Sequence, residues 1–170
     1  MKRIIFFVCL FSVAGVSALA ADFYSHDKAL SIIRKILKEK NLEITATFDL
    51  SEASAEGQHM LVYSFKSEDN LSERYAVFTE ALGRYDLFDY LVITDDTGKV
   101  QKVQVVKYRS EHGGEIASKK WLTQFENYSG GDLRYGDDIS AISGATLSAG
   151  SITRDMQRVV ESLQTKVIKK

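Results

Sequence analysis

The chain has 170 residues, of which 45% are apolar and 26% charged, and its formal net charge at pH 7 is −1. The length suits one domain with a substantial core, and the composition excludes a disordered or fibrous protein. The near-neutral net charge gives no indication of strong electrostatic binding to nucleic acid or to an acidic membrane surface.

The N-terminus has the pattern of an export signal. Lys2 and Arg3 precede an almost wholly apolar run over residues 4–16, and Ala18-Leu19-Ala20 then fits the small-x-small pattern of a cleavage site. The run is shorter than the about 20 residues that a membrane-spanning helix needs. We therefore predict a cleaved signal peptide over residues 1–20; an uncleaved N-terminal anchor is the alternative.

The mature chain, residues 21–170, is predicted to be a single periplasmic or otherwise extracytoplasmic domain. Cys9 is the only cysteine and lies inside the apolar run, so the mature chain has neither disulfide nor thiol chemistry. Its core alone must hold it together in an oxidising compartment. Loss of the two basic residues at the N-terminus changes the formal net charge from −1 to −3.

The first half of the mature chain begins with a helix and continues with strands. Apolar residues recur at helical spacing over residues 26–41 and predict a surface helix with one buried face. Apolar and polar residues alternate over 42–50, as in a half-buried strand. The other predicted elements are a turn or short helical piece over 51–57, strands over 60–65 and 75–79, and a polar break over 70–73.

A hairpin is the most strongly predicted unit of the chain. Strands over 87–94 and 99–108 flank the sequence Asp95-Asp96-Thr97-Gly98, in which aspartate tolerates turn geometry and glycine supplies a positive φ. The second strand is rich in valine, a β-branched residue that favours strands.

Two helices follow the hairpin. Ser118 is placed to cap a helix over 119–127, and residues 151–167 predict a last helix with a buried apolar stripe. This stripe comprises Ile152, Met156, Val159, Val160, Leu163 and Val167. Strands outnumber helices and adjoin one another, which predicts an α+β fold with a mainly antiparallel sheet packed with helices.

The segment 137–148 is the best candidate for chemistry. It leads into a helix, where unpaired N–H groups and the helix dipole favour a phosphate. Gly144 and Ala145 are small enough for the backbone to approach a ligand. Read from the residues alone, an ordinary helix cap and turn is the alternative. The hydroxyl-bearing residues of the segment are Ser140, Ser143, Thr146 and Ser148.

The sequence Ser143-Gly144-Ala145-Thr146 resembles the flavinylation motif of the FMN-binding domain family. This family includes the C subunit of sodium-translocating NADH:quinone reductase, the G subunit of the Rnf complex and the FMN domain of NosR-type regulators. The resemblance implies that an ApbE-type flavin transferase cuts FAD and joins the FMN phosphate to the hydroxyl of Thr146.

Two other blocks resemble the family, in the same order and at similar spacing. Residues 108–116 are similar to its strand and glycine-containing loop, and Trp121-Leu122-Thr123-Gln124-Phe125 to its W-x-x-Q-F helix. The resemblance spans about residues 75–165. One position departs from the family: Ser140 stands where an aspartate usually precedes the motif, and Asp138 is a possible substitute.

The resemblance implies a set of cofactor-binding residues, each with a structural alternative. The motif serine would bind the phosphate or stabilise a turn, and the serine at 148 would be a second acceptor or a helix cap. The aromatic residues would flank the flavin or belong to the core, and the 111–112 pair would approach the flavin or stay exposed. The set is Glu111, His112, Trp121, Phe125, Ser143, Gly144, Ala145, Thr146, Leu147 and Ser148.

The predicted function is electron transfer by an exported flavoprotein that carries FMN on Thr146. It would pass electrons between membrane-bound or exported redox partners rather than turn over a substrate of its own. A noncovalent FMN-binding module and a cofactor-free exported interaction domain are the alternatives. The sequence contains no nucleophile elbow, Walker loop, dinucleotide-binding glycine pattern or zinc-ligand spacing.

Overall fold

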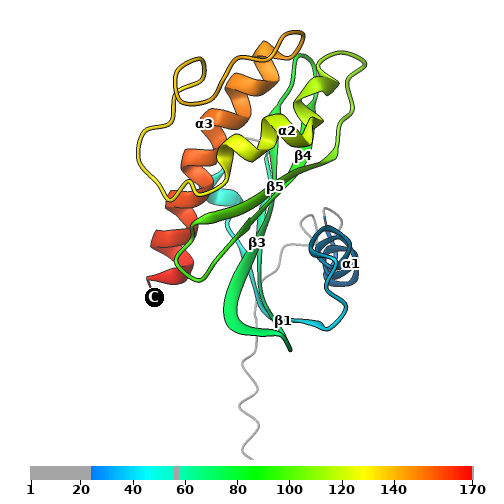
Figure 1. Cartoon of the computed structure of the whole chain (residues 1–170), viewed down its shortest axis with the longest axis vertical. Helices are drawn as coiled ribbons and strands as arrows, with labels where there is room; N and C mark the ends of the chain where they lie inside the picture. The colour runs from blue at the N-terminus through cyan, green and yellow to red at the C-terminus, as the bar shows by residue number, and fades with distance from the viewer. Residues whose placement is uncertain (1–23, 56–57, 170) are drawn as a thin grey trace, which may run out of the picture.

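The computed structural model describes residues 24–55 and 58–169 (Figure 1). The predicted signal peptide over residues 1–20 and the start of the mature chain lie outside the described residues, as do Glu56 and Gly57 of the predicted turn. Across the two described ranges, no helix combines the length and apolar character needed to cross a membrane.

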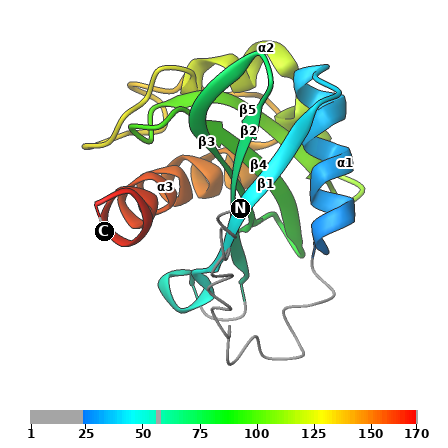
Figure 2. The same cartoon turned by 90° about the horizontal axis from the view of Figure 1, so that it is seen from below.

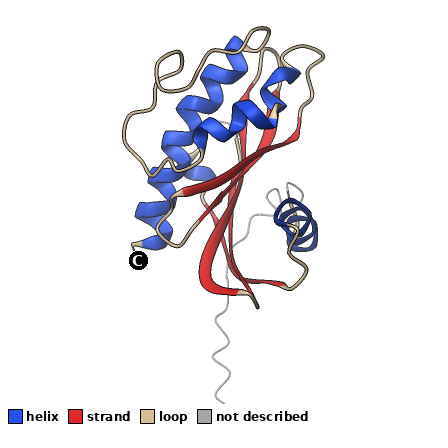
Figure 3. Cartoon of the chain, in the orientation of Figure 1, coloured by secondary structure: helices blue, strands red, loops and turns tan. Residues whose placement is uncertain are grey.

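A five-stranded antiparallel sheet forms the centre of the protein (Figure 3). Each strand pairs with the next strand along the chain, so the strand order is β1-β2-β3-β4-β5. Short connections are sufficient for such neighbours. The strands are β1 (Leu42–Asp49), β2 (Met60–Ser67), β3 (Asn70–Leu82), β4 (Leu87–Thr94) and β5 (Val100–Lys107).

Helices lie on both sides of the sheet (Figure 2). Helix α1 (His26–Leu37) packs on one face, and α3 (Thr146–Leu163) packs with α2 (Lys119–Leu122) on the other. Because β2, β4 and residues 74–81 of β3 are covered on both faces, they are almost continuously buried instead of alternating. The short helices are η2 (Ser51–Ala53), η3 (Gly114–Ala117), η4 (Thr123–Phe125) and the π-helical turn η5 (Gln164–Ile168).

The α+β prediction, the antiparallel sheet and the predicted hairpin over residues 87–108 are confirmed, and three local predictions are wrong. Residues 70–73 belong to β3: Asn70 pairs with Ser67 of β2, and the next pair along the strand is Arg74 with Phe65. The side chains of residues 70–72 are exposed and that of Glu73 is partly exposed. Helix α3 starts at Thr146, five residues before the predicted start. Residues 119–127 form only one α-helical turn followed by η4, and Ser118 makes no side-chain cap hydrogen bond.

Each face of the sheet has its own hydrophobic core. The stripe predicted for the last helix is buried from Ile152 to Leu163 against β3 and β4, and Tyr90 of β4 donates a hydrogen bond to Asp155 of α3. On the opposite face of the sheet, Ile33 of α1 is fully buried in a second core with residues of β2, β3 and β4. Burial of both faces fixes the sheet between two helical layers.

Replacing Ile33 with alanine should test the contribution of α1. The Ile33→Ala variant should lower the free energy of unfolding by about 2 to 5 kcal/mol, because it leaves a cavity where no solvent enters. Urea unfolding measures the loss. Ser31→Ala on the exposed face of the same helix should change it by less than about 0.5 kcal/mol, and an equal loss in both variants would contradict the packing role.

A buried polar cluster lies on the α1 side of the sheet. Glu80 and Asp89 are directly opposite each other on β3 and β4, and both are buried. Asp89 pairs with Arg109 and accepts a hydrogen bond from the Tyr24 hydroxyl at 3.0 Å. Glu80 accepts one from the backbone N–H of His59 at 3.1 Å. Burial raises the pKa of Glu80, and the neighbouring carboxylate of Asp89 raises it further.

The raised pKa predicts that Glu80→Gln stabilises the protein at neutral pH. The folded wild-type chain binds a proton at Glu80 more tightly than the unfolded chain, so wild-type stability rises as the pH falls through the folded-state pKa. The neutral variant lacks this dependence. At pH 7.5 the urea midpoint of the variant should exceed that of the wild type, and the difference between the two midpoints should shrink as the pH approaches the unfolded-state pKa of 4.5. A difference that does not change with pH would contradict the role of the Glu80 charge.

Candidate functional site

The chain turns into α3 at Gly144, which has a φ of +82°. A side chain is strained there, and a Cβ would also lie 3.2 Å from the carboxyl carbon of Glu115. Ala145 is the N-cap residue, and its carbonyl accepts the first helical hydrogen bond from Ala149 at 2.8 Å. No side chain caps this helix terminus, so the first-turn N–H groups keep their capacity to bind an anion.

A hollow of about 290 Å³ opens at this helix terminus. Three segments that are distant in sequence form it: the β3–β4 connection, the loop after β5, and the first turn of α3. They meet at the upper end of the view in Figure 1, where α3 begins. The lining residues are Arg84, His112, Gly113, Gly144, Ala145, Thr146, Leu147 and Ser148.

Tyr108 connects the loop after β5 to α3. Its hydroxyl donates to the carbonyl of His112 at 2.9 Å and lies 3.0 Å from the Ser148 hydroxyl. Because the phenol has one hydrogen, Ser148 is the donor in the second hydrogen bond. Gly113 has a φ of +90°, and a Cβ there would lie 2.5 Å from the Tyr108 oxygen. These contacts explain why this loop contains a glycine.

The two candidate acceptor hydroxyls on α3 differ in accessibility. Thr146 is exposed and lines the hollow, whereas Ser148 is 2% exposed and bonded to Tyr108. Residues two apart on an α-helix point about 200° apart, so only one of the two can face the sheet. The free hydroxyl of the hollow therefore belongs to Thr146. Thr146 occupies the first helical position, not the N-cap position that the capping alternative requires.

The loop preceding the motif is held through its backbone at Ser140. The Trp121 indole N–H donates to the Ser140 carbonyl at 2.8 Å, and the Gln124 side-chain oxygen accepts from the Ser140 N–H at 2.8 Å. Two residues of the W-x-x-Q-F block thus bind both backbone polar groups of one residue. Since neither contact involves the Ser140 side chain, the clamp does not depend on which residue stands at this position.

Asp138, the possible substitute for the missing aspartate, is engaged elsewhere. Its carboxylate accepts from the backbone N–H of Arg134 at 2.8 Å, and the Arg134 guanidinium lies 3.5 Å away. These contacts organise the turn over residues 134–139. Asp138 does not line the hollow.

The structure brings six of the predicted residues to the hollow and leaves four outside it. Trp121 and Phe125 are core residues that contact each other edge to face, and Trp121 reaches the segment before the motif through its hydrogen bond to the Ser140 carbonyl. Glu111 and Ser143 are exposed beside the hollow without lining it. The six lining residues are His112, Gly144, Ala145, Thr146, Leu147 and Ser148.

Sequence reasoning missed Arg84, Gly113, Tyr108 and the role of Gln124. Arg84 follows a glycine in a short connection, and nothing in its surroundings indicates a site until folding places it near α3. The tyrosine and glycine stand inside the family-like block 108–116, so that resemblance was a usable signal. Among the described residues no group of three or more His, Cys, Asp or Glu side chains is arranged to hold a metal ion.

Removing the Gln124 acceptor should loosen the motif loop. Gln124→Met keeps the side-chain length but loses the hydrogen bond from the Ser140 N–H, so the unfolding free energy should fall by about 1 kcal/mol. Amide hydrogen exchange at residues 139–142 should quicken. Lys120→Met, on the exposed side of α2, is the matched control. Unchanged exchange at Ser140 in the Gln124 variant would contradict the role of Gln124 in holding this loop.

Comparison with known proteins adds one finding. Residues 87–161 match the model of a family described as FMN-binding domain. The matched segment runs from the start of β4 to near the end of α3 and contains Thr146 and every lining residue except Arg84. No significantly similar curated protein was found. Helix α1 and strands β1 to β3 lie outside the matched segment.

Proposed function

We propose, from the match of residues 87–161 to the FMN-binding domain family, that this chain is an exported flavoprotein that holds FMN in a phosphoester with Thr146 and carries electrons outside the cytoplasm. The observation that carries the proposal is the exposed Thr146 hydroxyl at the uncapped start of α3. FMN binding itself follows from the family; the covalent bond, the export and the carrier role are the proposed parts.

The residues of the hollow suit the phosphate of FMN. The first-turn N–H groups and the dipole of α3 favour a negative group at this position. Arg84 adds a guanidinium to the same lining. Gly144 keeps the backbone free of a Cβ where the chain bends into the helix. These features favour a phosphate group directly attached to, or bound beside, Thr146.

Attachment requires one accessible hydroxyl and a donor of the FMN phosphate. In the proposed reaction the Thr146 oxygen attacks the FMN-side phosphorus of FAD, an O–P bond forms, the phosphoanhydride bond breaks, and AMP leaves. The hydroxyl proton passes to a base of the ApbE-type flavin transferase. Ser148 is not the acceptor in this proposal, since its buried hydroxyl is bonded to Tyr108.

The size and openness of the site favour a carrier over an enzyme. Bound FMN accepts and releases electrons, while the protein holds and orients it. A hollow of about 290 Å³ lies at the lower limit of small-molecule sites, which suits a group bound near the surface better than an enclosed substrate. Leu147, which is 63% exposed, adds an apolar surface beside the hollow. The redox partners proposed are a membrane-bound donor and an exported acceptor.

Export would explain why a covalent ester is useful. An exported carrier cannot be resupplied with FMN from the cytoplasm, so a bound cofactor that dissociates is lost. The N-terminal sequence supports export through the secretory pattern ending at Ala20. N-terminal sequencing of the chain isolated from its native envelope should therefore begin at Ala21.

Thr146→Ala should abolish covalent flavin. When the chain is coexpressed with a flavin transferase, the wild-type mass should exceed the sequence mass by one FMN less one water, and the alanine variant should show no increase. Thr146→Ser should retain the adduct because it keeps the hydroxyl. Intact-mass spectrometry and in-gel flavin fluorescence after denaturation provide the measurement.

Two controls separate the attachment site from general damage. Ser148→Ala and Thr123→Ala should both retain the adduct, the first because its hydroxyl is not the acceptor and the second because it lies on η4, away from the hollow. Wild-type protein that binds FMN but shows no mass increase would favour the noncovalent module. A colourless protein would favour the cofactor-free interaction domain.

A further inference from the structure

A second and larger concavity lies away from the flavin site. It holds about 720 Å³ and runs between α1, the outer edge of β5 and the α2–η4 segment. Val103 and Val105 of β5 are the buried part of its floor. Ile32 and Ile36 of α1 form an apolar wall on one side. We name it the β5 groove; it shares no lining residue with the hollow at α3.

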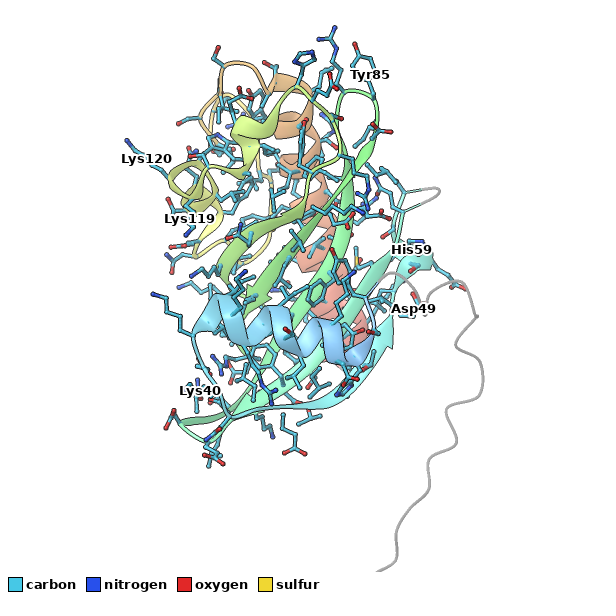
Figure 4. All side chains as sticks on the ribbon, turned by 90° about the vertical axis from the view of Figure 1, so that its right-hand side faces the viewer. Lys40, Asp49, His59, Tyr85, Lys119 and Lys120 are labelled. Atoms are coloured by element: carbon cyan, nitrogen blue, oxygen red, sulfur yellow. The ribbon has the colours of Figure 1, made fainter. Side chains whose placement is uncertain are left out.

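The charge of the β5 groove is opposite to that of the whole chain. Four lysines line it and only one carboxylate, Glu126, whereas the chain has a formal net charge of −1. The lysines come from three separate segments, and Figure 4 shows Lys119 and the neighbouring Lys120 projecting on the same side of the molecule as the end of α1. The four lining lysines are Lys35, Lys38, Lys102 and Lys119.

The floor of the groove is the edge strand β5, on which the Val105 carbonyl accepts a hydrogen bond from the Gln104 side-chain amide at 3.1 Å. Strand β5 is the last strand of the sheet and pairs with β4 on its inner side. On its outer side, residues 127–128 pair with the backbone of Val100 at 2.8 and 2.7 Å. From Lys102 to Val106 no other strand of the described residues covers this edge. A strand edge of this kind can accept an extended peptide through backbone hydrogen bonds.

We propose that the β5 groove binds an extended acidic segment of a partner protein, which adds to the sheet beside β5. Backbone groups of residues 102–106 would pair with the segment. Carboxylates of the segment would meet the four lysines, and its alternate apolar side chains would contact Ile32, Ile36 and Val106. The groove is separate from the hollow, so the partner would leave the Thr146 site accessible.

Charge and shape disfavour two other occupants. A second copy paired through the same edge would bring two lysine clusters together, because a symmetric dimer uses the same patch twice. A membrane surface would meet the lysines, but lipid tails offer no hydrogen-bond partners to the backbone of β5. An acidic extended peptide satisfies the lysines and the strand edge together.

The test uses the purified chain and a synthetic peptide in which valine alternates with acidic residues. A peptide in which valine alternates with lysine is the control. Fluorescence anisotropy at low salt should show binding of the acidic peptide only. The charge reversals Lys102→Glu and Lys119→Glu together should weaken it at least about tenfold, since two attractions become repulsions. The matched pair Lys166→Glu and Lys169→Glu, exposed but outside the groove, should change it less than about twofold.

Amide hydrogen exchange locates the peptide. Bound acidic peptide should slow exchange at residues 102–106 and leave β1, the opposite edge strand, unchanged. Unchanged exchange at 102–106, or equal weakening by both pairs of reversals, would overturn the proposal. Binding to phosphatidylglycerol vesicles without binding of the peptide would also overturn it. Self-association of the variant with both Lys102 and Lys119 reversed, with unchanged peptide binding, would overturn it as well, because the lysines would then only prevent β5 from pairing with a second copy.

Discussion

Helix α3 lies across β3 and β4, because its apolar residues from Ile152 to Leu163 are fully buried there and the Tyr90 hydroxyl donates a hydrogen bond to Asp155. Its axis therefore places its N-terminus at one end of the sheet, beside the β3–β4 connection and the loop after β5. The candidate site is a consequence of this packing. Contacts at Ser148 and Ser151, which accepts from the Leu82 N–H at 3.0 Å, then fix the first turns of the helix.

This arrangement gives two nearby hydroxyls different chemistry. The helical rotation between positions 146 and 148 turns one side chain towards the sheet and the other towards solvent. Ser148 becomes a structural link to Tyr108, and Thr146 remains available. The aromatic residues of the W-x-x-Q-F block contribute in the same indirect way, since Trp121 binds the Ser140 carbonyl from within the core. Accessibility, more than residue type, decides which hydroxyl can become an ester.

The hollow and the β5 groove lie at different places on one sheet and have different chemistry. One is small, partly formed by backbone and located at a helix terminus; the other is larger, apolar at its floor and rimmed by lysines. The segment that matches the family contains nearly all of the first, whereas the second also needs α1, which precedes that segment. The proposed cofactor site and the proposed partner surface thus occupy separate places on one chain.

The sequence alone determined the order and type of most elements, and it determined the motif. Alternation and helical periodicity are local properties, so they predicted β1, the 87–108 hairpin and the apolar stripe of α3. The motif Ser143-Gly144-Ala145-Thr146 could be recognised in the sequence because its four residues are contiguous. The local composition also accounts for the error at 70–73, where exposed side chains hid a strand whose pairing with β2 is held at Asn70 and Arg74.

Only the tertiary structure decided which of these residues meet. Arg84 and Gly113 are about 60 and 30 residues from Thr146, and no local pattern records that they line one hollow with it. The burial of Ser148, the clamp on Ser140 and the lysines gathered around β5 likewise depend on how α1, α2 and α3 pack on the sheet. Packing joins segments that are distant along the chain, and periodicity carries no information about such pairs.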